Sequence, residues 1–175
     1  MRPSKRGLNG VAGRDIFSKP VRTITHDELV EHFPKLRPDN YQRVSLATPR
    51  YNCMAFANDD DRHWWQPGLF GKKYYWPSGV PQDGSIESWV RIFTGCGYVL
   101  TDNADTEPDC EKIAIYASLR DGSATHVAKS DGVSWKSKLG KGQDILHASL
   151  GILEGDDRDE YGTVDKLLKK PKANV

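Results

Sequence analysis

Two Asp-Gly pairs, Asp121-Gly122 and Asp131-Gly132, constrain the fold of this chain more than any other feature. An Asp-Gly pair next to alternating apolar residues is a strong signal for a tight hairpin turn. Apolar residues alternate in 112–118, and 124–130 lies between the two turns, so both segments are predicted to be strands. With a further extended segment at 144–148, the second half is expected to form an antiparallel meander.

The first half carries helix signals instead. Thr25 and Glu28 have the spacing of a capping box and predict a short helix that ends before Pro34. Ser85 is predicted to cap a second helix, in which apolar residues recur at spacings of three and four. A last helix is predicted over 164–170, because its lysines suit the C-terminal end of the helix dipole. Helices followed by antiparallel strands predict an α+β domain.

Length and charge limit the possible classes. A chain of 175 residues is expected to form one domain, 23–175, preceded by a flexible basic arm, 1–22, with contact to an anionic surface as the arm's alternative role. A net charge of +1 argues against a nucleic-acid partner. Nowhere do 18 apolar residues follow one another, so no membrane partner is expected.

The cysteines indicate a free thiol. Cys53, Cys96 and Cys110 cannot all pair within one chain, and none has the spacing of a zinc site, so we expect neither a metal nor a cofactor. The N-terminus lacks the apolar stretch of a secretory signal. We therefore expect the chain in the cytoplasm, or delivered by a route that is independent of a signal peptide.

Cys53 is the candidate nucleophile. Pro49 favours an extended approach, and the apolar run 54–57 predicts a short buried helix that begins at Cys53. A thiol in the first turn of a helix has a lowered pKa, and its backbone N–H could stabilise an oxyanion, with Tyr41 or Gln42 as candidates for a second donor. The alternative is a structural cysteine, since cysteine is among the most buried residue types.

Two histidines on predicted neighbouring strands could activate this thiol. His126 could take the proton of Cys53 as a general base. His147 could orient His126 as the third member of a triad, and Asp144 is the alternative orienting residue. Each histidine could instead be a core residue.

An aromatic-rich segment, 62–81, concentrates large rings among glycines and prolines. Such rings are seldom left in solvent, so the segment is predicted either to pack on the domain or to wall a cleft beside Cys53. The candidate wall residues are Trp64, Trp65, Tyr75 and Trp76.

The order of these motifs resembles the papain-like cysteine hydrolases of the NlpC type, with CHAP-type amidases as close relatives. In those families the nucleophile follows a polar-aromatic lead, here Tyr51-Asn52-Cys53, and the base opens a strand, here His126-Val127-Ala128. The third residue is polar and often a histidine before alanine, here His147-Ala148. The similarity covers roughly residues 41–150, and the string YNC-x-A-x-A also resembles uncharacterised bacterial proteins of this superfamily.

The resemblance implies a papain-like α+β fold, with helices packed on an antiparallel sheet and the cysteine at a helix N-terminus. It also implies a thiol-dependent hydrolase that cleaves an amide or isopeptide bond of a peptide or protein. Asn52 stands where NlpC enzymes usually carry an acid, which favours an intracellular amidase or a delivered bacterial toxin or effector over a wall peptidase. An inhibitor or immunity protein would then be a partner.

Two alternatives remain. A non-catalytic module could use 62–81 to bind a peptide, a glycan or a protein. A deamidase or acyltransferase would keep the same triad and change only the acyl acceptor or the substrate. The distance between the Cys53 sulfur and the His126 ring separates enzyme from binding module, because a proton transfer between them requires roughly 3–4 Å.

Overall fold

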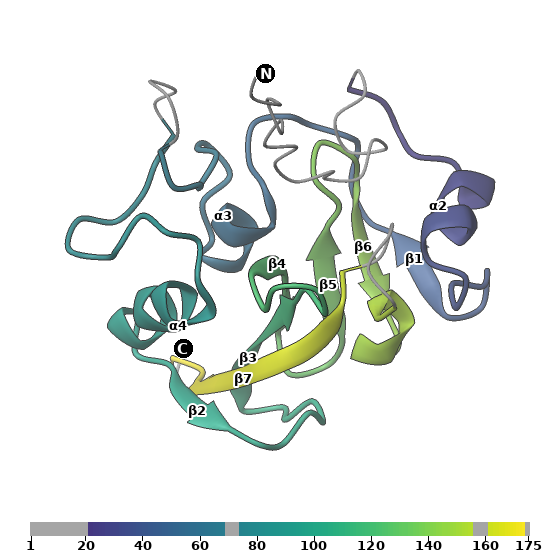
Figure 1. The fold of residues 1–175 in the computed structure, drawn as a ribbon. Coiled ribbons are helices and arrows are strands. Elements are labelled where there is room, and N and C mark those ends of the chain that lie inside the picture. The colour runs from purple at the N-terminus through teal and green to yellow at the C-terminus, as the bar shows by residue number, and fades with distance from the viewer. Residues whose placement is uncertain (1–20, 69–73, 156–160, 174–175) are drawn as a thin grey trace, which may run out of the picture.

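The computed structural model describes residues 21–68, 74–155 and 161–173. Within them, seven strands form one antiparallel sheet in the order β1-β6-β5-β4-β3-β7-β2 (Figure 1). The strands are β1 (Tyr41–Arg43), β2 (Val99–Thr101), β3 (Cys110–Ala117), β4 (Ala124–Ser130), β5 (Trp135–Lys138), β6 (Asp144–His147) and β7 (Thr163–Pro171). The helices are α2 (His26–His32), α3 (Cys53–Ala57), α4 (Ile86–Gly95) and the short 3-10 helix η1 (Leu150–Leu153).

Strands β3 to β6 form the predicted antiparallel meander. Ile115 of β3 lies opposite Val127 of β4, and β5 pairs in turn with β4 and β6. Gly122 and Gly132 follow these strands with φ angles of 68° and 90°. Because glycine adopts this left-handed region without a steric penalty, the Asp-Gly pairs close the two connections.

The predicted papain-like fold is wrong. The described chain is dominated by its sheet, the longest helix, α4, has ten residues, and the cysteine-bearing helix α3 has only five. No helix in these residues is long and apolar enough to cross a membrane.

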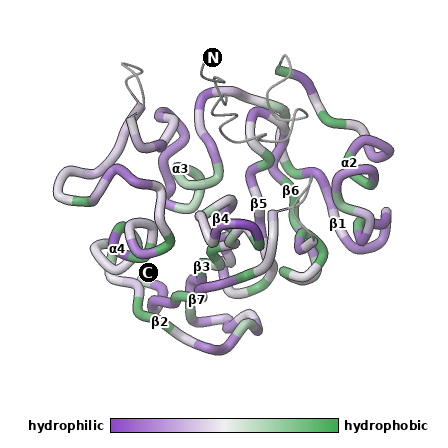
Figure 2. The backbone as a smooth tube through the Cα atoms, in the orientation of Figure 1, coloured by the Kyte–Doolittle hydropathy of each residue, from purple (hydrophilic) through white to green (hydrophobic). Residues whose placement is uncertain are grey.

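The predicted helix at 164–170 is also wrong, because this segment lies in strand β7 between β3 and β2. Lysine and leucine favour a helix locally, but pairing with two neighbouring strands overrides that preference. The hydrophilic stretches of β7 are visible in Figure 2.

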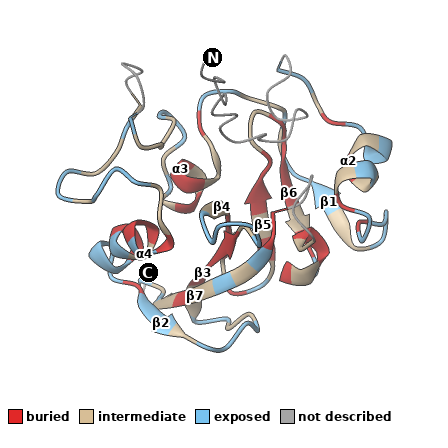
Figure 3. Ribbon diagram, viewed as in Figure 1, coloured by how far each residue is buried: buried red, intermediate tan, exposed pale blue. Residues whose placement is uncertain are grey.

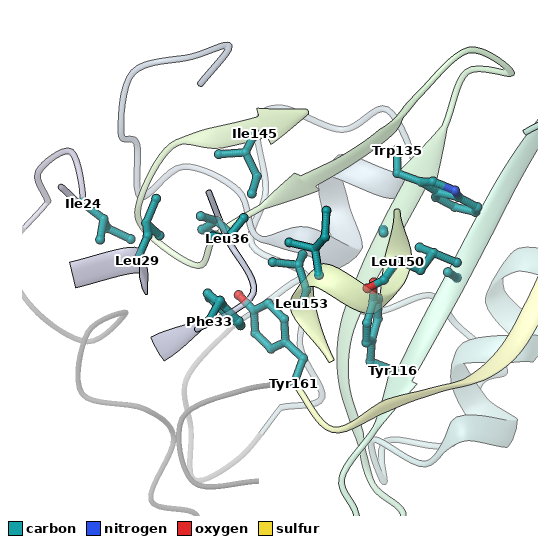
Figure 4. Close-up of a cluster of buried hydrophobic side chains, with 14 residues drawn as sticks. Ile24, Leu29, Phe33, Leu36, Tyr116, Trp135, Ile145, Leu150, Leu153 and Tyr161 are labelled. Atoms are coloured by element: carbon teal, nitrogen blue, oxygen red, sulfur yellow. The ribbon is translucent and has the colours of Figure 1, made fainter. Parts of the chain in front are cut away.

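Each face of the sheet carries its own apolar core. On the face that we call the α2 face, side chains from α2, η1 and the strands pack together, among them Phe33, Tyr116 and Trp135 (Figure 4). On the opposite face, the α3 face, α3 and α4 pack on the sheet, and Met54 joins Val127 in the core. Figure 3 shows the buried side of α4 and the buried strands between these layers. Since successive side chains of a strand point to opposite faces, neighbouring residues contribute to different cores.

The start of the described chain is held by side chains. Thr25 and Glu28 form the predicted capping box of α2. The amide of Gln143 exchanges two hydrogen bonds with the backbone of Ile24, at 2.9 and 2.8 Å. The predicted flexible arm, 1–22, lies outside the described residues apart from its last two.

Gly162 marks a close approach between the chain before β7 and the end of β3. Its φ is +76°, and a Cβ atom placed there would lie 1.9 Å from the carbonyl oxygen of Ala117. We expect Gly162→Ala to lower the free energy of unfolding by about 1–3 kcal/mol more than Gly122→Ala, because only the former adds a steric clash. Gly122 is the matched control, with a φ of +68° and open space around it. Urea unfolding measures both values, and equal losses would contradict the clash.

Candidate functional site

Cys53 is the first residue of α3 and lies on the α3 face of the sheet. Asn52 caps the helix, since its Oδ1 accepts a hydrogen bond from the backbone N–H of Ala55 at 3.2 Å. The helix packs on β4 and β5, and Cys53 is exposed only in part, with its thiol buried at the border of the core that contains Val127. The nucleophile candidate is thus held by a short capped helix against two central strands.

Asn52 also ties the aromatic segment to the start of α3. Its Oδ1 accepts from the backbone N–H of Trp65 at 3.2 Å, and its Nδ2 donates to the Trp65 carbonyl at 2.6 Å. Trp65 and Trp76 pack against the same core as Cys53. Tyr75 contacts Trp65 with ring centres 4.5 Å apart and is 45% exposed.

Of the predicted wall residues, Trp65 and Trp76 therefore border the Cys53 core. The ring of Trp64 instead donates to the Gln66 side chain at 3.0 Å.

A buried pair of opposite charges lies on the same face as Cys53. Lys138 is 0% exposed and Asp144 is 6% exposed, and the two residues face each other across β5 and β6. The hydroxyl of Tyr51 donates to Asp144 Oδ2 at 2.9 Å, and Lys138 Nζ lies 5.1 Å from the centre of the Tyr51 ring. Lys138 also donates to the carbonyl of Gly142. Asp144 Oδ1 is buried without a hydrogen-bond partner among the described residues.

The charges of these groups depend on one another. Burial raises the pKa of Cys53 to about 11, while backbone N–H groups and the charge of Lys138 act in the opposite direction. Burial lowers the pKa of Lys138 to about 8, against the attraction of Asp144 and Cys53. Burial also raises the pKa of Asp144, opposed by its hydrogen bond from Tyr51 and by Lys138.

The expected lowering of the Cys53 pKa is therefore wrong. The helix that should lower it has only five residues, and removal of the thiol from water outweighs its effect. Cys53 is a protonated thiol at neutral pH, so any reaction through its sulfur needs a base nearby.

His126 and His147 lie on the α2 face and are joined through Ser137. The Ser137 hydroxyl lies 2.9 Å from His126 Nε2 and 3.0 Å from His147 Nε2, and all three residues are buried. The ring of His126 stacks on Tyr161 with centres 3.9 Å apart.

The hydrogen-bond acceptors of His126, Ser137 and His147 determine which ring nitrogens carry a proton. His147 Nδ1 lies 2.9 Å from the Ser149 carbonyl, and a carbonyl only accepts, so Nδ1 carries the proton. Burial lowers the pKa of His147 to about 4, so the ring is neutral at pH 7 and its Nε2 accepts from Ser137. Because the Ser137 hydroxyl donates its only hydrogen to His147 Nε2, its oxygen accepts from His126 Nε2. The result is a directed hydrogen-bond chain inside the domain.

The sheet separates the three members of the expected triad. Val127 points to the core beside Cys53, so its neighbour His126 points to the other face and does not meet the thiol. The structure brings His126 and His147 together, but away from Cys53. Asp144, the alternative orienting residue, is the predicted partner that lies on the Cys53 face.

The two residues expected to support the oxyanion lie on strand β1, at the edge of the sheet. The hydroxyl of Tyr41 lies 2.8 Å from His26 Nδ1, and its ring packs on the core of the α2 face. Gln42 lies opposite Leu146 at the edge of the sheet. By this register Gln42 points to the same face of the sheet as Asp144, but from the outermost strand β1, whereas Tyr41 points to the opposite face.

Comparison with known families places this site within one domain family. Residues 42–169 match a family described as a domain of unknown function, DUF7689. The chain belongs to the DUF7689 family. Neither a curated protein nor a solved structure matches it. The DUF7689 region contains Cys53, Lys138 and Asp144, and it begins after the segment predicted to be an arm.

Lys138 is the functional candidate of the DUF7689 domain that sequence reasoning missed. A weak signal exists, because Lys136 and Lys138 alternate with Trp135 and Ser137 in a short extended segment. In such a pattern one of the two faces of the strand is usually exposed to solvent, so both lysines would be expected at the surface. Among the described residues, no three His, Cys, Asp or Glu side chains gather as metal ligands would.

Proposed function

We propose that the chain is a thiol-dependent hydrolase of an amide or related acyl bond, with Cys53 as nucleophile and Lys138 as the base. The observation that carries this proposal is the buried Lys138–Asp144 pair on the face of the sheet that holds Cys53. Strongly shifted pKa values with a specific charge partner concentrate at functional sites. The pKa of the Cys53 thiol is raised to about 11 and that of Lys138 is lowered to about 8, and the charge of each group acts on the other, which supports this assignment of roles.

Each step of the proposed reaction uses groups of this cluster. The neutral amine of Lys138 takes the thiol proton, and the thiolate attacks the carbonyl carbon of the substrate. The Lys138 ammonium then gives its proton to the leaving amine as the C–N bond breaks, which leaves a thioester on Cys53. Water attacks the thioester, gives a proton to Lys138 and releases the carboxylic acid, and the proton returns to the thiolate.

Two further contacts support this sequence of steps. Asp144 attracts the ammonium form of Lys138 and so stabilises it after each proton transfer, while Tyr51 holds the carboxylate. The backbone N–H groups of Cys53 and Met54 approach the thiol and lower its pKa. The same two donors could hold the oxyanion that forms at the substrate carbonyl.

The nucleophile is tested with p-nitrophenyl acetate, an acyl donor whose leaving group needs no proton. We expect Cys53→Ala to lower the rate of p-nitrophenol release by about 10²-fold or more, and peptide mapping of the wild type to place the acetyl group on Cys53. Cys96→Ala is the matched control, since Cys96 is an exposed thiol beside the other end of α3, where its sulfur lies 3.6 Å from Asn58 Oδ1. Acetylation that favours Cys96 or Cys110, with an unchanged rate in Cys53→Ala, would overturn the proposal.

The same thioester could pass its acyl group to an amine instead of water. Adding glycinamide to the acetylation reaction separates the two outcomes, because N-acetylglycinamide forms only if an amine competes with water. Hydrolysis predicts acetate as the main product at millimolar amine.

A further inference from the structure

The charge of this chain is divided unevenly along its length. Residues 1–20 carry five basic side chains and one acidic one, so with a total of +1 the other residues carry a net charge of −3. The basic residues are Arg2, Lys5, Arg6, Arg14 and Lys19, and they alternate with apolar ones, among them Leu8, Val11, Ile16 and Phe17. A basic and apolar segment joined to an acidic domain is attracted to it over a distance of about 10 Å at moderate salt.

The α2 face offers a groove with complementary chemistry. It has a volume of about 700 Å³ and is lined by residues of η1, of β7, of the start of β5 and of the loop 104–106. Apolar side chains line it, namely Val133, Trp135, Leu150, Val164 and Leu167. Two carboxylates, Asp105 and Glu154, lie among them.

A second, more open groove of about 480 Å³ continues the first at Ser134, His147 and Ala148. It adds a third carboxylate, Asp39. No lysine or arginine is among the described residues that line either groove. The joined surface, which we call the acidic groove, combines apolar and uncharged polar side chains, and the charged residues among its described lining are all acidic.

Hydrogen bonds to the backbone hold the loop that carries Asp105. The ammonium of the fully buried Lys112 binds the carbonyls of Asn103 and Asp105 and pairs with Glu107. Lys112 thereby holds the loop that carries Asp105, while its own charge is directed to Glu107.

The neighbouring cations compensate the other carboxylates only in part. Lys35 donates at 3.0 Å to the backbone carbonyl of Glu154, and not to its carboxylate, which accepts from the backbone N–H of Val164 at 2.9 Å. Arg37 pairs with Asp39 at 3.5 Å, but both side chains are mostly exposed, and exposed pairs contribute little. A basic ligand could therefore replace Arg37 at low cost.

We infer that residues 1–20 bind in the acidic groove of their own chain. Lys and Arg side chains of this segment pair with Asp105 and Glu154, and its apolar residues cover Val133 and Leu167. Twenty residues span up to about 66 Å when extended, which exceeds the diameter of a domain of this size. Because the segment is tethered, its effective concentration at the groove is on the order of millimolar, so modest affinity is sufficient. This inference is independent of the reaction proposed for Cys53, which lies on the opposite face.

Zero-length cross-linking of the intact chain with a water-soluble carbodiimide tests this contact, since the reagent joins lysine amines to carboxylates. We expect Lys5 or Lys19 to link to Asp105 or Glu154, with a yield that falls at least fivefold in 1 M NaCl. An equal mixture of ¹⁵N-labelled and unlabelled chain should give cross-links within one isotopic form. Links between the two forms would show a contact between copies and would overturn binding within one chain.

Matched lysine variants distinguish the groove from general charge attraction. Val133→Lys adds a positive charge at a groove residue that is 79% exposed, and we expect at least a fivefold lower yield of the links to Asp105 and Glu154. Leu46→Lys makes the same change at a residue that is 76% exposed and does not line the groove, and it should leave the yield unchanged. Links spread evenly over Asp59, Asp61 and the groove carboxylates, or equal yields in the two variants, would overturn the inference.

Discussion

Replacing Lys138 by methionine is expected to slow the acetylation of Cys53 by p-nitrophenyl acetate about 10²-fold at pH 8. General bases typically contribute 10²- to 10⁴-fold, and the lower value applies because this leaving group needs no acid. Without the amine, the thiol must ionise unaided, and burial holds its pKa near 11 even with the help of Lys138. Stopped-flow absorbance of the released p-nitrophenol gives the rate directly.

The pH dependence separates a base from a structural residue. In the wild type the acetylation rate should rise with pH and level off above a midpoint of about 8, where Lys138 loses its proton. In Lys138→Met the rise should move toward the pKa of the thiol itself. An unchanged midpoint with an unchanged rate would show that Lys138 is not the base.

Two further variants distinguish the loss of a base from a loss of folding. Lys136→Met makes the same change two residues earlier, at a side chain that is 34% exposed and pairs with Asp131, and it should keep the wild-type rate. Lys138→Met leaves the buried Asp144 without its cation, so the double change Lys138→Met with Asp144→Asn restores a balanced interior. Both Lys138 variants should lose the rate, and thermal unfolding shows whether each is folded.

Local signals explain which parts of the fold could be predicted. The meander follows from period-two alternation and Asp-Gly turns, and α4 from its Ser85 cap and apolar spacing, all of which act over a few residues. β7 could not be predicted this way. Its lysines and leucines favour a helix locally, and it becomes a strand through pairing with β3 and β2, which are distant in sequence. The papain-like expectation failed for the same reason, since motif order does not encode which strands pair.

The candidate site likewise has one part that local sequence signals predict and one part that depends on strand pairing. That Cys53 begins a helix could be predicted, because Pro49 and the following apolar run act locally. Which side chains meet Cys53 depends on the face to which each strand residue points, and a shift of one residue reverses the answer. His126 and Ser137 face one core, whereas Val127 and Lys138 face the other. Motif order therefore favours His126 as the base, whereas the strand register identifies Lys138 as the candidate on the face of Cys53.

Acid should destabilise this protein through His147. Its pKa is about 4 in the folded chain and about 6.5 when unfolded, so the folded state prefers the neutral ring. The stabilisation is complete above pH 6.5 and is lost as the pH falls toward 4, because the unfolded chain binds the proton first. The difference amounts to about 3 kcal/mol at pH 4, at about 1.4 kcal/mol for each pKa unit. Urea unfolding between pH 7 and pH 4 should therefore show a steep loss.

The hydrogen bonds through Ser137 explain why the folded state disfavours a second proton on the His147 ring. His147 Nδ1 already donates to Ser149, so a proton on Nε2 would face the hydroxyl hydrogen of Ser137. The Ser137 oxygen could then accept from both rings, but its own hydrogen would lose its acceptor on His147. Protonation of His147 thus breaks the directed hydrogen-bond chain. Among the described residues its hydrogen-bond partners are Ser137 and Ser149, and neither is a carboxylate that would stabilise the charge.

Glutamine variants isolate this effect from the titration of carboxylates over the same range. His147→Gln keeps one donor and one acceptor but cannot bind the proton, so we expect its stability to fall by about 3 kcal/mol less than that of the wild type between pH 7 and pH 4. His63→Gln is the matched control, because the His63 side chain is 58% exposed and is bonded to Asp60 at the surface. It should keep the steep loss of the wild type. Parallel curves for the wild type and His147→Gln would mean that His147 binds its proton equally well in both states, and that the buried chain does not control its charge.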